Sequence, residues 1–214
     1  MAQVTPQSLT PRKRPRQARA AATVDAIYEA TIQVLLSDGP HRLTTTRVAE
    51  RAGVSVGTMY QYFPQKQALI HALNERYLER LAEKIEATCR EQHGAPAGTM
   101  VEALIETYWR AKTERPEVTR ALYRSVADLD NAALIDRFAR RVDTATIAML
   151  ETASDMRFAD LKTINRTLVT VIFGAVRNAF ERELADTEAA AVMQQLVLMC
   201  RRYVDGLSPA PKNA

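Results

Sequence analysis

Residues 43–69 constrain the fold of this chain more than any other segment, and they read LTTTRVAERAGVSVGTMYQYFPQKQAL. Apolar residues recur at helical spacing over residues 46–52, which predicts a short amphipathic helix. Gly53 follows, where the end of a helix favours a residue that tolerates left-handed backbone. Ser55 can then cap a second helix, expected over residues 55–62, by accepting a backbone N–H bond. The segment therefore predicts two short helices joined by a tight turn.

A third helix is expected to hold these two in place, because helices this short are not stable alone in water. It is predicted over residues 24–38, where apolar residues fall on one stripe. Gly39 and Pro40 end it, since glycine terminates a helix readily and proline cannot continue one. Two helices joined by a short turn form the layout that places the second helix in the major groove of DNA. We therefore expect residues 24–63 to form a three-helix DNA-binding unit.

The same segment resembles the amino-terminal signature of the TetR family of bacterial transcriptional regulators. That pattern is a Thr-rich helix start, an apolar–Ala pair, Ala-Gly-Val-Ser, Gly-Thr-x-Tyr, an aromatic–Phe pair and a Lys. The matching positions here are Thr44, Thr45, Val48, Ala49, residues 52–55, Gly57, Thr58, Tyr60, Tyr62, Phe63 and Lys66. The resemblance covers residues 24–80. It implies a dimeric, ligand-responsive regulator, usually a repressor in this family.

The remainder of the chain alternates helical patterns with glycine and proline breaks, so the expected fold class is all-α. We expect an N-terminal three-helix helix-turn-helix DNA-binding domain followed by a larger helical ligand-binding and dimerisation domain. The expected divisions are a basic, disordered arm at residues 1–20, the DNA-binding domain at 21–66, the effector-binding and dimerisation domain at 91–208 and a flexible tail at 209–214. The later helices are expected over residues 65–90, which connects the domains, and over 99–114, 116–128, 131–153, 159–184 and 186–206.

The N-terminal arm concentrates positive charge. Residues 1–20 hold Arg12, Lys13, Arg14, Arg16 and Arg19 and no acidic residue, whereas the whole chain has a net charge of +4. A proline-containing basic segment of this kind cannot bury enough apolar surface to fold. It either follows DNA phosphates and enters the minor groove, or it is a solvated tail that aids solubility. The sequence supports the two interpretations equally.

Binding to DNA needs phosphate contacts for register and base contacts for sequence. The candidate DNA-binding residues are Thr44, Thr45, Thr46, Arg47, Ser55, Val56, Gly57, Thr58, Tyr60, Gln61, Tyr62 and Lys66. Thr44 or Thr45 can donate a hydroxyl to a phosphate, cap the helix, or do both. Arg47 can contact the DNA or remain a solvated charge. Met59 and Phe63 are expected to point into the core.

The second helix of the motif supplies the residues for reading sequence. Gln61 can pair with an adenine through two hydrogen bonds, and Val56 can contact a thymine methyl. Gly57 costs about 1 kcal/mol relative to Ala inside a helix, which suggests that DNA must approach closely there. Tyr60 and Tyr62 are similar to phosphate-contacting aromatics of the family, unless one of them stacks in the core. Lys66 stands at a helix start and is expected to bind a phosphate.

The second domain is rich in large apolar side chains that would suit a hydrophobic or aromatic effector. The candidate effector residues are Tyr108, Trp109, Tyr123, Phe138, Met149 and Phe173, together with Met100 and with Arg177 as a polar anchor. For any one of the apolar residues, ordinary core packing is the alternative. Arg110, Arg124 and Asn178 are further possible anchors, and helix phase does not choose among them.

The last two expected helices contain the apolar runs LVTVIFGAV and AAAVMQQLVLM. A helix that is apolar on nearly all sides must be buried on more than one face. The resemblance implies that these helices, over about residues 159–206, form the homodimer interface, where Gly174 and Ala175 would permit close approach. A two-fold dimer in turn implies a near-palindromic operator.

Two other classes of protein fit the sequence less well. An enzyme is disfavoured because the chain shows no phosphate loop, Ser/His/Asp arrangement or glycine-rich cofactor turn, and we expect no cofactor. An architectural DNA-binding protein would not need the long apolar-rich segment that follows the motif.

The remaining composition indicates a cytoplasmic protein without a membrane partner. The longest charge-free stretch of the late helices, between Arg166 and Arg177, is too short to span a bilayer, and no apolar secretory signal follows Met1. The three histidines lack metal-ligand spacing. Cys89 and Cys200 are expected to be free thiols in a reducing cytosol, with a redox switch as the alternative.

Overall fold

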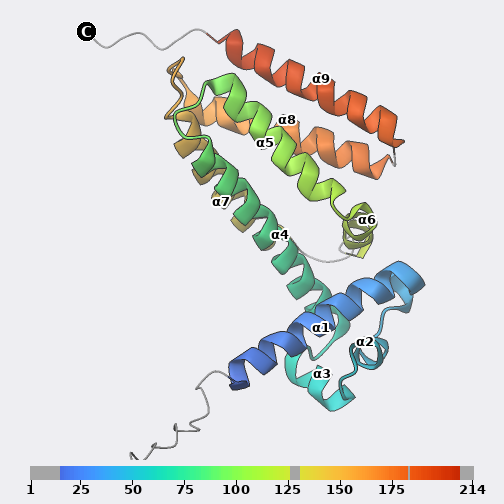
Figure 1. Cartoon of the computed structure of the whole chain (residues 1–214). Helices are drawn as coiled ribbons and strands as arrows, with labels where there is room; N and C mark the ends of the chain where they lie inside the picture. Colours follow the sequence, from blue (N-terminus) through green and yellow to red (C-terminus); the bar gives the residue numbers. More distant parts are fainter. Residues whose placement is uncertain (1–14, 126–130, 183, 208–214) are drawn as a thin grey trace, which may run out of the picture. The chain divides into compact units, whose positions relative to one another are not determined.

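The computed structural model describes residues 15–125, 131–182 and 184–207 (Figure 1). Every regular element in these ranges is helical, which confirms the expected all-α class. The chain divides into two compact units, Met1–Leu69 and Ile70–Ala214, each with its own buried residues. None of the helices in the described ranges is long and apolar enough to cross a membrane.

The first unit contains α1 (Pro15–Asp38), the single turn η1 (Pro40–Arg42), α2 (Thr45–Ala52) and α3 (Val56–Tyr62). α1 packs against α2, and α2 packs against α3. Each helix contributes a fully buried side chain to the core: Ile27, Val48 and Met59. Phe63, directly after α3, is also buried, and its ring lies 5.7 Å from that of Tyr28, centroid to centroid. The expected core positions of Met59 and Phe63 are thus confirmed.

The first helix begins earlier than its apolar stripe indicates. It begins at Pro15 instead of residue 24, so residues 15–20 are helical and do not belong to a disordered arm. Proline fits the first turn of a helix because its missing N–H needs no partner there. The following RQARAAA has high intrinsic helix propensity but no apolar stripe, so periodicity gives no signal. Residues 1–14, with Arg12, Lys13 and Arg14, lie outside the described ranges.

The second unit contains most of α4 (Lys66–Glu91) and then α5 (Ala97–Thr113), α6 (Pro116–Ser125), α7 (Ala132–Leu150), α8 (Leu161–Glu181) and α9 (Asp186–Asp205). These helices begin and end within a few residues of the expected positions. The end of the helix expected over residues 116–128 falls partly outside the described ranges. α4 begins before Leu69 and continues into the second unit, so one helix crosses the boundary between the units.

α5 is the central helix of the second unit, because it contacts α6, α7, α8 and α9. Met100 and Ile105 on its apolar face are fully buried. α9 runs along α5 (Figure 1), and Arg201 of α9 donates a hydrogen bond of 2.6 Å to the carboxylate of Glu102, 99 residues earlier in the chain. A late helix therefore covers the apolar face of an early one.

Candidate nucleic-acid interface and the aromatic cluster

Local capping fixes the geometry of the two short helices. The Thr44 hydroxyl accepts a hydrogen bond from the backbone N–H of Arg47 at 3.2 Å and so caps α2. Gly53 has φ of 67°, a left-handed conformation that favours glycine, and its N–H bonds the carbonyl of Ala49. Ser55 caps α3 by accepting from the N–H of Thr58 at 3.0 Å. The glycine turn and both caps follow from residues that the sequence places there.

α3 buries one face and exposes the other. Met59 is fully buried, whereas Val56, Tyr60 and Tyr62 are among the exposed large hydrophobic residues of the described ranges. Gln61 is exposed as well. Both tyrosines are therefore outside the core, which removes the alternative that one of them stacks inside. The outer face of α3 thus presents apolar, aromatic and amide side chains without an acidic residue among them.

Thr44 and Thr45 separate into two roles. The side chain of Thr45 is buried, whereas Thr44 is exposed at the start of α2. The Thr44 hydroxyl already accepts an N–H bond, yet its own O–H remains available to donate. Capping and phosphate binding are therefore compatible at Thr44. Thr46 is exposed in the first turn, and Lys66, the first residue of α4, is half-buried.

Arg47 is a paired charge instead of a free solvated one. Its guanidinium donates to the carboxylate of Asp38 at 2.6 Å, from α2 to the end of α1. The pKa of Asp38 is lowered, first by the hydrogen bond from the Ser37 hydroxyl and then by the hydrogen bond and the charge of Arg47. Desolvation acts in the opposite direction and does not outweigh them. About half of the Arg47 side chain remains exposed, so it can reach DNA only by leaving or sharing this partner.

The fold of the first unit does not require glycine at position 57. A Cβ atom built there would meet only the Ser55 hydroxyl, at an ordinary contact distance of 3.8 Å. A glycine in a helix is nevertheless less stable than alanine by about 1 kcal/mol. Because the chain itself leaves the space open, any steric demand at Gly57 must come from another molecule.

Most of the expected effector residues lie in one aromatic cluster of the second unit. The rings of Tyr108 and Phe173 stack at 4.1 Å between centroids, and Phe138 lies 5.8 Å from Phe173. The Arg177 guanidinium lies 5.8 Å from the ring centre of Tyr123. These side chains come from α5, α6, α7 and α8, so the cluster joins four helices of the unit.

The other expected effector residues pack elsewhere or cannot be placed. Trp109 packs edge-on against Phe180, with ring centroids 6.4 Å apart. Met149 and Met100 are fully buried in the core, as the ordinary-packing alternative expects. The side chain of Arg124 lies outside the described part of the structure.

Lys112, which is not among the residues expected from the sequence, lies inside the aromatic cluster. Its side chain is almost completely buried, and its Nζ donates to the hydroxyl of Tyr77 at 2.8 Å. The ammonium also faces the rings of Tyr77, Tyr108 and Tyr123 at 4.7, 5.3 and 4.8 Å from their centroids. Burial first, and the charge of Arg177 second, lower the pKa of Lys112 to about 7. The available signal was its position four residues after Tyr108, on the same helix face.

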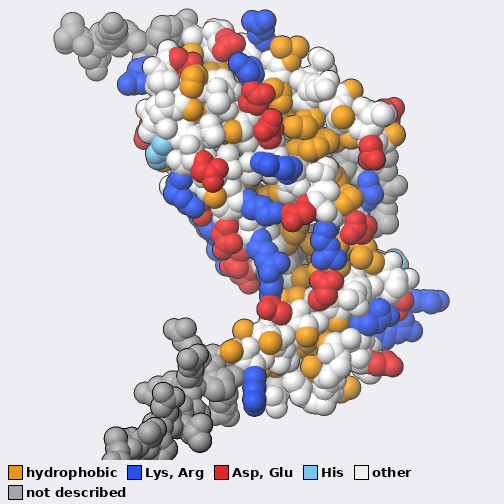
Figure 2. Space-filling view, in the orientation of Figure 1, with side chains coloured by type: hydrophobic (Ala, Val, Ile, Leu, Met, Phe, Trp, Pro, Cys, Tyr) orange, Lys and Arg blue, Asp and Glu red, His pale blue; other side chains and the backbone are white. Residues whose placement is uncertain are grey.

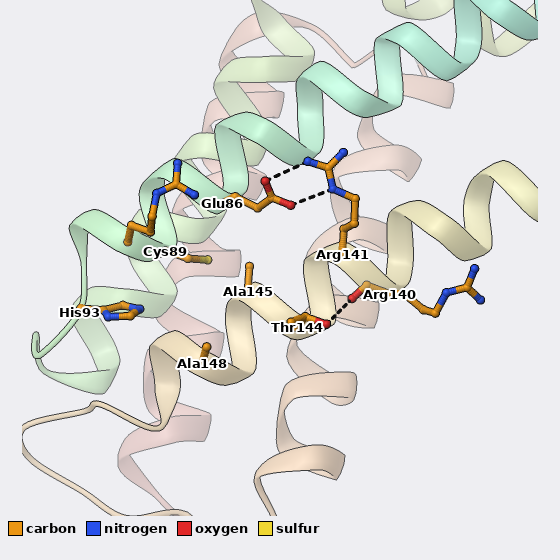
Figure 3. A pocket seen from close by; sticks show the side chains of 9 residues that line it. Glu86, Cys89, His93, Arg140, Arg141, Thr144, Ala145 and Ala148 are labelled. Atoms are coloured by element: carbon orange, nitrogen blue, oxygen red, sulfur yellow. Dashed lines mark hydrogen bonds and ion pairs between the residues drawn. The ribbon is translucent and has the colours of Figure 1, made fainter.

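A groove of about 460 Å³ lies between α4 and α7 (Figure 3). Arg141 of α7 donates to both carboxylate oxygens of Glu86 on α4, at 2.8 and 2.9 Å. None of the expected effector residues lines this groove, whose walls are formed by Glu86, Cys89, Arg90, His93, Arg140, Arg141, Thr144, Ala145 and Ala148. It is therefore a separate feature from the aromatic cluster.

The thiols of Cys89 and Cys200 are free and buried. Burial is the largest cause that raises the pKa of Cys89, to about 11, and burial also raises the pKa of Cys200. A thiol with a raised pKa stays protonated near neutral pH and reacts slowly with oxidants, which disfavours a redox switch. In the described ranges no group of three His, Cys, Asp or Glu residues could hold a metal ion.

Two family models match the two units. Residues 27–73 match the model described as bacterial regulatory proteins, tetR family, and residues 96–203 match the Tetracyclin repressor-like C-terminal domain. Among curated relatives, the nucleoid occlusion factor SlmA of Haemophilus ducreyi is 34% identical over 118 residues, which cover 55% of this chain and 57% of that protein. The HTH-type transcriptional repressor KstR of Rhodococcus jostii is 31% identical over 119 residues, which cover 55% and 54%. The chain thus spans about half the length of the curated relatives it matches.

Solved structures share the fold at lower sequence identity. A TetR transcription regulator from Haloarcula marismortui matches with a TM-score of 0.67 at 24% identity, over 87% of this chain and 98% of that one. The fatty acid degradation regulator FadR from Bacillus halodurans matches with a TM-score of 0.62 at 17% identity, over 86% and 99%. These matches extend over both units.

Proposed function

The chain belongs to the TetR family of bacterial regulatory proteins, and on that premise we propose a homodimeric repressor that a small hydrophobic effector releases from a near-palindromic operator. Family membership makes it a DNA-binding transcriptional regulator. Dimerisation, repression and effector release are the proposed parts, and its place of action is the bacterial cytoplasm, on the nucleoid. The relatives reported above are a repressor and a nucleoid occlusion factor, not enzymes, so the proposal includes no catalysis.

The outer face of α3 is the observation that carries the proposal. Val56, Tyr60 and Gln61 are exposed on a helix that Met59 anchors in the core, and Gly57 leaves the backbone accessible beside them. In this role Gln61 and Val56 read bases. Thr44, Thr46, Tyr60, Tyr62 and Lys66 bind phosphates and set the register.

The proposed dimer interface uses α8 and α9. Exposed hydrophobic side chains gather on α9 at Val192, Leu198, Met199 and Tyr203, and Figure 2 shows hydrophobic side chains over the part of the second unit where α5, α8 and α9 lie. On α8, Gly174 is exposed and a Cβ there would meet nothing within 4 Å. Ala175 instead packs partly against the core of its own protomer. The close-approach role therefore fits Gly174 better than Ala175.

The aromatic cluster supports the proposed effector site. Tyr108, Phe138 and Phe173 offer large apolar surfaces, and Arg177 beside Tyr123 supplies a polar group. Tyr77, next to this cluster, lies on α4, the helix that begins in the DNA-binding unit. A ligand that changes the preferred tilt of α4 would change the separation of the two copies of α3, the helices proposed to enter the major groove, in the dimer. Operator DNA demands one separation, so release follows from differential affinity of the ligand for the two states.

Replacing Gln61 with alanine tests the DNA-reading role of α3. We expect the preference at one base position in each half-site to relax by about 1–3 kcal/mol, because the paired hydrogen bonds to that base are lost. Selection of binding sites from randomised DNA measures this directly. Gln33→Ala, at an exposed glutamine of α1, is the matched control and should leave the selected sequence unchanged. A sequence preference identical to that of the wild type in Gln61→Ala would rule out base reading by Gln61.

Replacing Lys66 with alanine tests phosphate binding. We expect affinity to fall about equally for operator and scrambled DNA, because a phosphate contact carries no sequence information. The slope of log affinity against log salt concentration should become smaller by about one, because one phosphate contact fewer releases one counterion fewer. Titrations of both DNAs at several salt concentrations measure the slopes. Lys162→Ala removes an exposed lysine from the first turn of α8 and should leave both slopes as they are. A loss confined to the operator would contradict the assignment.

A further inference from the structure

Lys112 is a buried cation that lies among aromatic rings. It is 2% exposed, and it has the largest volume among the fully buried residues of the described ranges. Among the residues that the structure describes, its ammonium donates a hydrogen bond to the Tyr77 hydroxyl, at 2.8 Å. The ring faces of Tyr77, Tyr108 and Tyr123 surround it at about 5 Å, a range in which the negative face of a ring attracts a cation. Three helices, α4, α5 and α6, contribute these rings.

The part of the chain that the structure describes provides no carboxylate for this ammonium. In that part of the chain, the ion pairs of the second unit do not include Lys112. Among them are Lys84–Glu114, Arg137–Glu75 and Arg141–Glu86. The charged group that affects Lys112 is another cation, Arg177 of α8. Arg177 has its own acidic partner, Glu181, at 2.6 Å on the exposed side of α8. Two positive groups thus share one aromatic cluster, and no acidic residue of the described ranges pairs with the inner one.

A buried ammonium without a counter-ion is unfavourable, because the protein interior solvates charge poorly. The pKa of Lys112, lowered to about 7 by burial and by Arg177, expresses the same cost. An anion next to Nζ would remove this energetic cost, because it would stabilise the charged form of Lys112. A neutral ligand would not stabilise the charged form of Lys112, and a cationic ligand would meet repulsion from Arg177 and from Lys112 whenever Lys112 is charged.

We propose that the effector of this protein is an amphipathic acid, whose carboxylate binds Lys112 and whose apolar part packs on Tyr108, Phe138 and Phe173. The inference rests on the proposed effector release and specifies its ligand class. Tyr77 and Tyr123 are only half-buried, and the Arg177 side chain is 64% exposed. The acid therefore approaches from the side of Tyr123 and Arg177, where the guanidinium attracts it first.

The site also gives the ligand a direct effect on α4. In the free protein the ammonium donates to Tyr77 of α4. An ammonium has three N–H donors, so a carboxylate can bind Nζ beside Tyr77 and compete with that hydroxyl for the position of Nζ, between α5 and the helix that begins in the DNA-binding unit. The ligand thereby changes the support of α4 without contacting DNA, as allosteric coupling requires.

The experiment compares three probes of equal chain length: decanoate, decanol and decyltrimethylammonium. Calorimetry is performed at pH 8 in buffers of different ionisation enthalpy, so that proton uptake is measured together with affinity. We expect decanoate to bind at least about ten-fold more tightly than decanol, with uptake of close to one proton per site, because Lys112 is mostly neutral at pH 8 before binding and charged after it. The affinity for decanoate should fall about ten-fold per pH unit above pH 7.

The variant Lys112→Met keeps an unbranched side chain of similar length and removes the buried charge, so the fold is retained. We expect it to bind decanoate no better than decanol and to take up no proton. Lys84→Met, at an exposed lysine of α4, is the matched control and should behave like the wild type. Equal affinity for decanoate and decanol in the wild type, preference for the cationic probe, or proton uptake that persists in Lys112→Met would each overturn the inference.

Displacement of labelled operator separates this inference from the proposed function. Release by decanoate in the wild type but not in Lys112→Met supports both. Binding with proton uptake but without release supports the acid site and contradicts effector release at this site. Release by decanol but not by decanoate supports the regulator and overturns the acid site. Where release occurs, operator DNA should weaken decanoate binding by the same factor, since coupling is reciprocal.

Discussion

Replacing Met199 with aspartate should convert the protein into monomers and lower its affinity for a two-half-site operator by about a thousand-fold, because the second half-site then no longer adds to binding. Met199 is 52% exposed on α9, so the charge is solvated in the monomer and the fold is kept. In a two-fold interface the same substitution occurs twice and buries two unpaired carboxylates. Light scattering gives the mass, and fluorescence anisotropy of labelled operator gives the affinity.

Ile135→Asp is the matched control for this experiment. Ile135 is 56% exposed on α7, so it is an equally exposed hydrophobic residue of the same unit outside α8 and α9. It should remain dimeric and keep its operator affinity. A Met199→Asp protein that stays dimeric at micromolar concentration, or an Ile135→Asp protein that dissociates, would place the interface elsewhere.

Replacing Gly57 with leucine should separate DNA binding from stability. We expect operator affinity to fall by about a hundred-fold, because the side chain would project from α3 at the point where the proposed binding mode places the backbone against the groove wall. The melting temperature should stay the same or rise, since the chain leaves space at this position. Leucine is also more favourable than glycine inside a helix, by about 0.8 kcal/mol. Thermal unfolding and anisotropy titrations measure the two quantities on the same samples.

A graded series sharpens the test at Gly57. Alanine should cost less affinity than leucine, with valine between them in size, whereas stability should not follow the same order. Affinity that is independent of side-chain size would show that DNA does not approach this part of α3. Loss of affinity together with loss of stability would show that the fold requires the glycine after all.

The accuracy of sequence-based prediction differs between the two units for a physical reason. The turn at Gly53 and the cap at Ser55 depend on residues a few positions away, so local chemistry is sufficient to predict them. The early start of α1 at Pro15 was missed because RQARAAA favours helix through propensity alone, without an apolar stripe.

The aromatic cluster depends on packing between distant helices. Tyr77, Lys112 and Arg177 come from α4, α5 and α8, and nothing local to any of them indicates that they share one site. A lysine on a helix is normally read as solvent-exposed, since lysines are rarely buried. The same limit affected Ala175, because helix phase relative to the core decides whether it or Gly174 faces outward.

The pairing of α5 with α9 has a consequence during protein synthesis. The contacts of the first unit join residues of α1, α2 and α3, which leave the ribosome early and can fold while translation continues. α5 must wait for α9, since Glu102 meets Arg201 only 99 residues later. At common translation rates the part of α5 that α9 covers stays exposed for about 5–20 seconds after α5 is synthesised. Because α9 also carries the exposed hydrophobic residues of the proposed interface, nascent chains would carry a folded DNA-binding unit before they can pair.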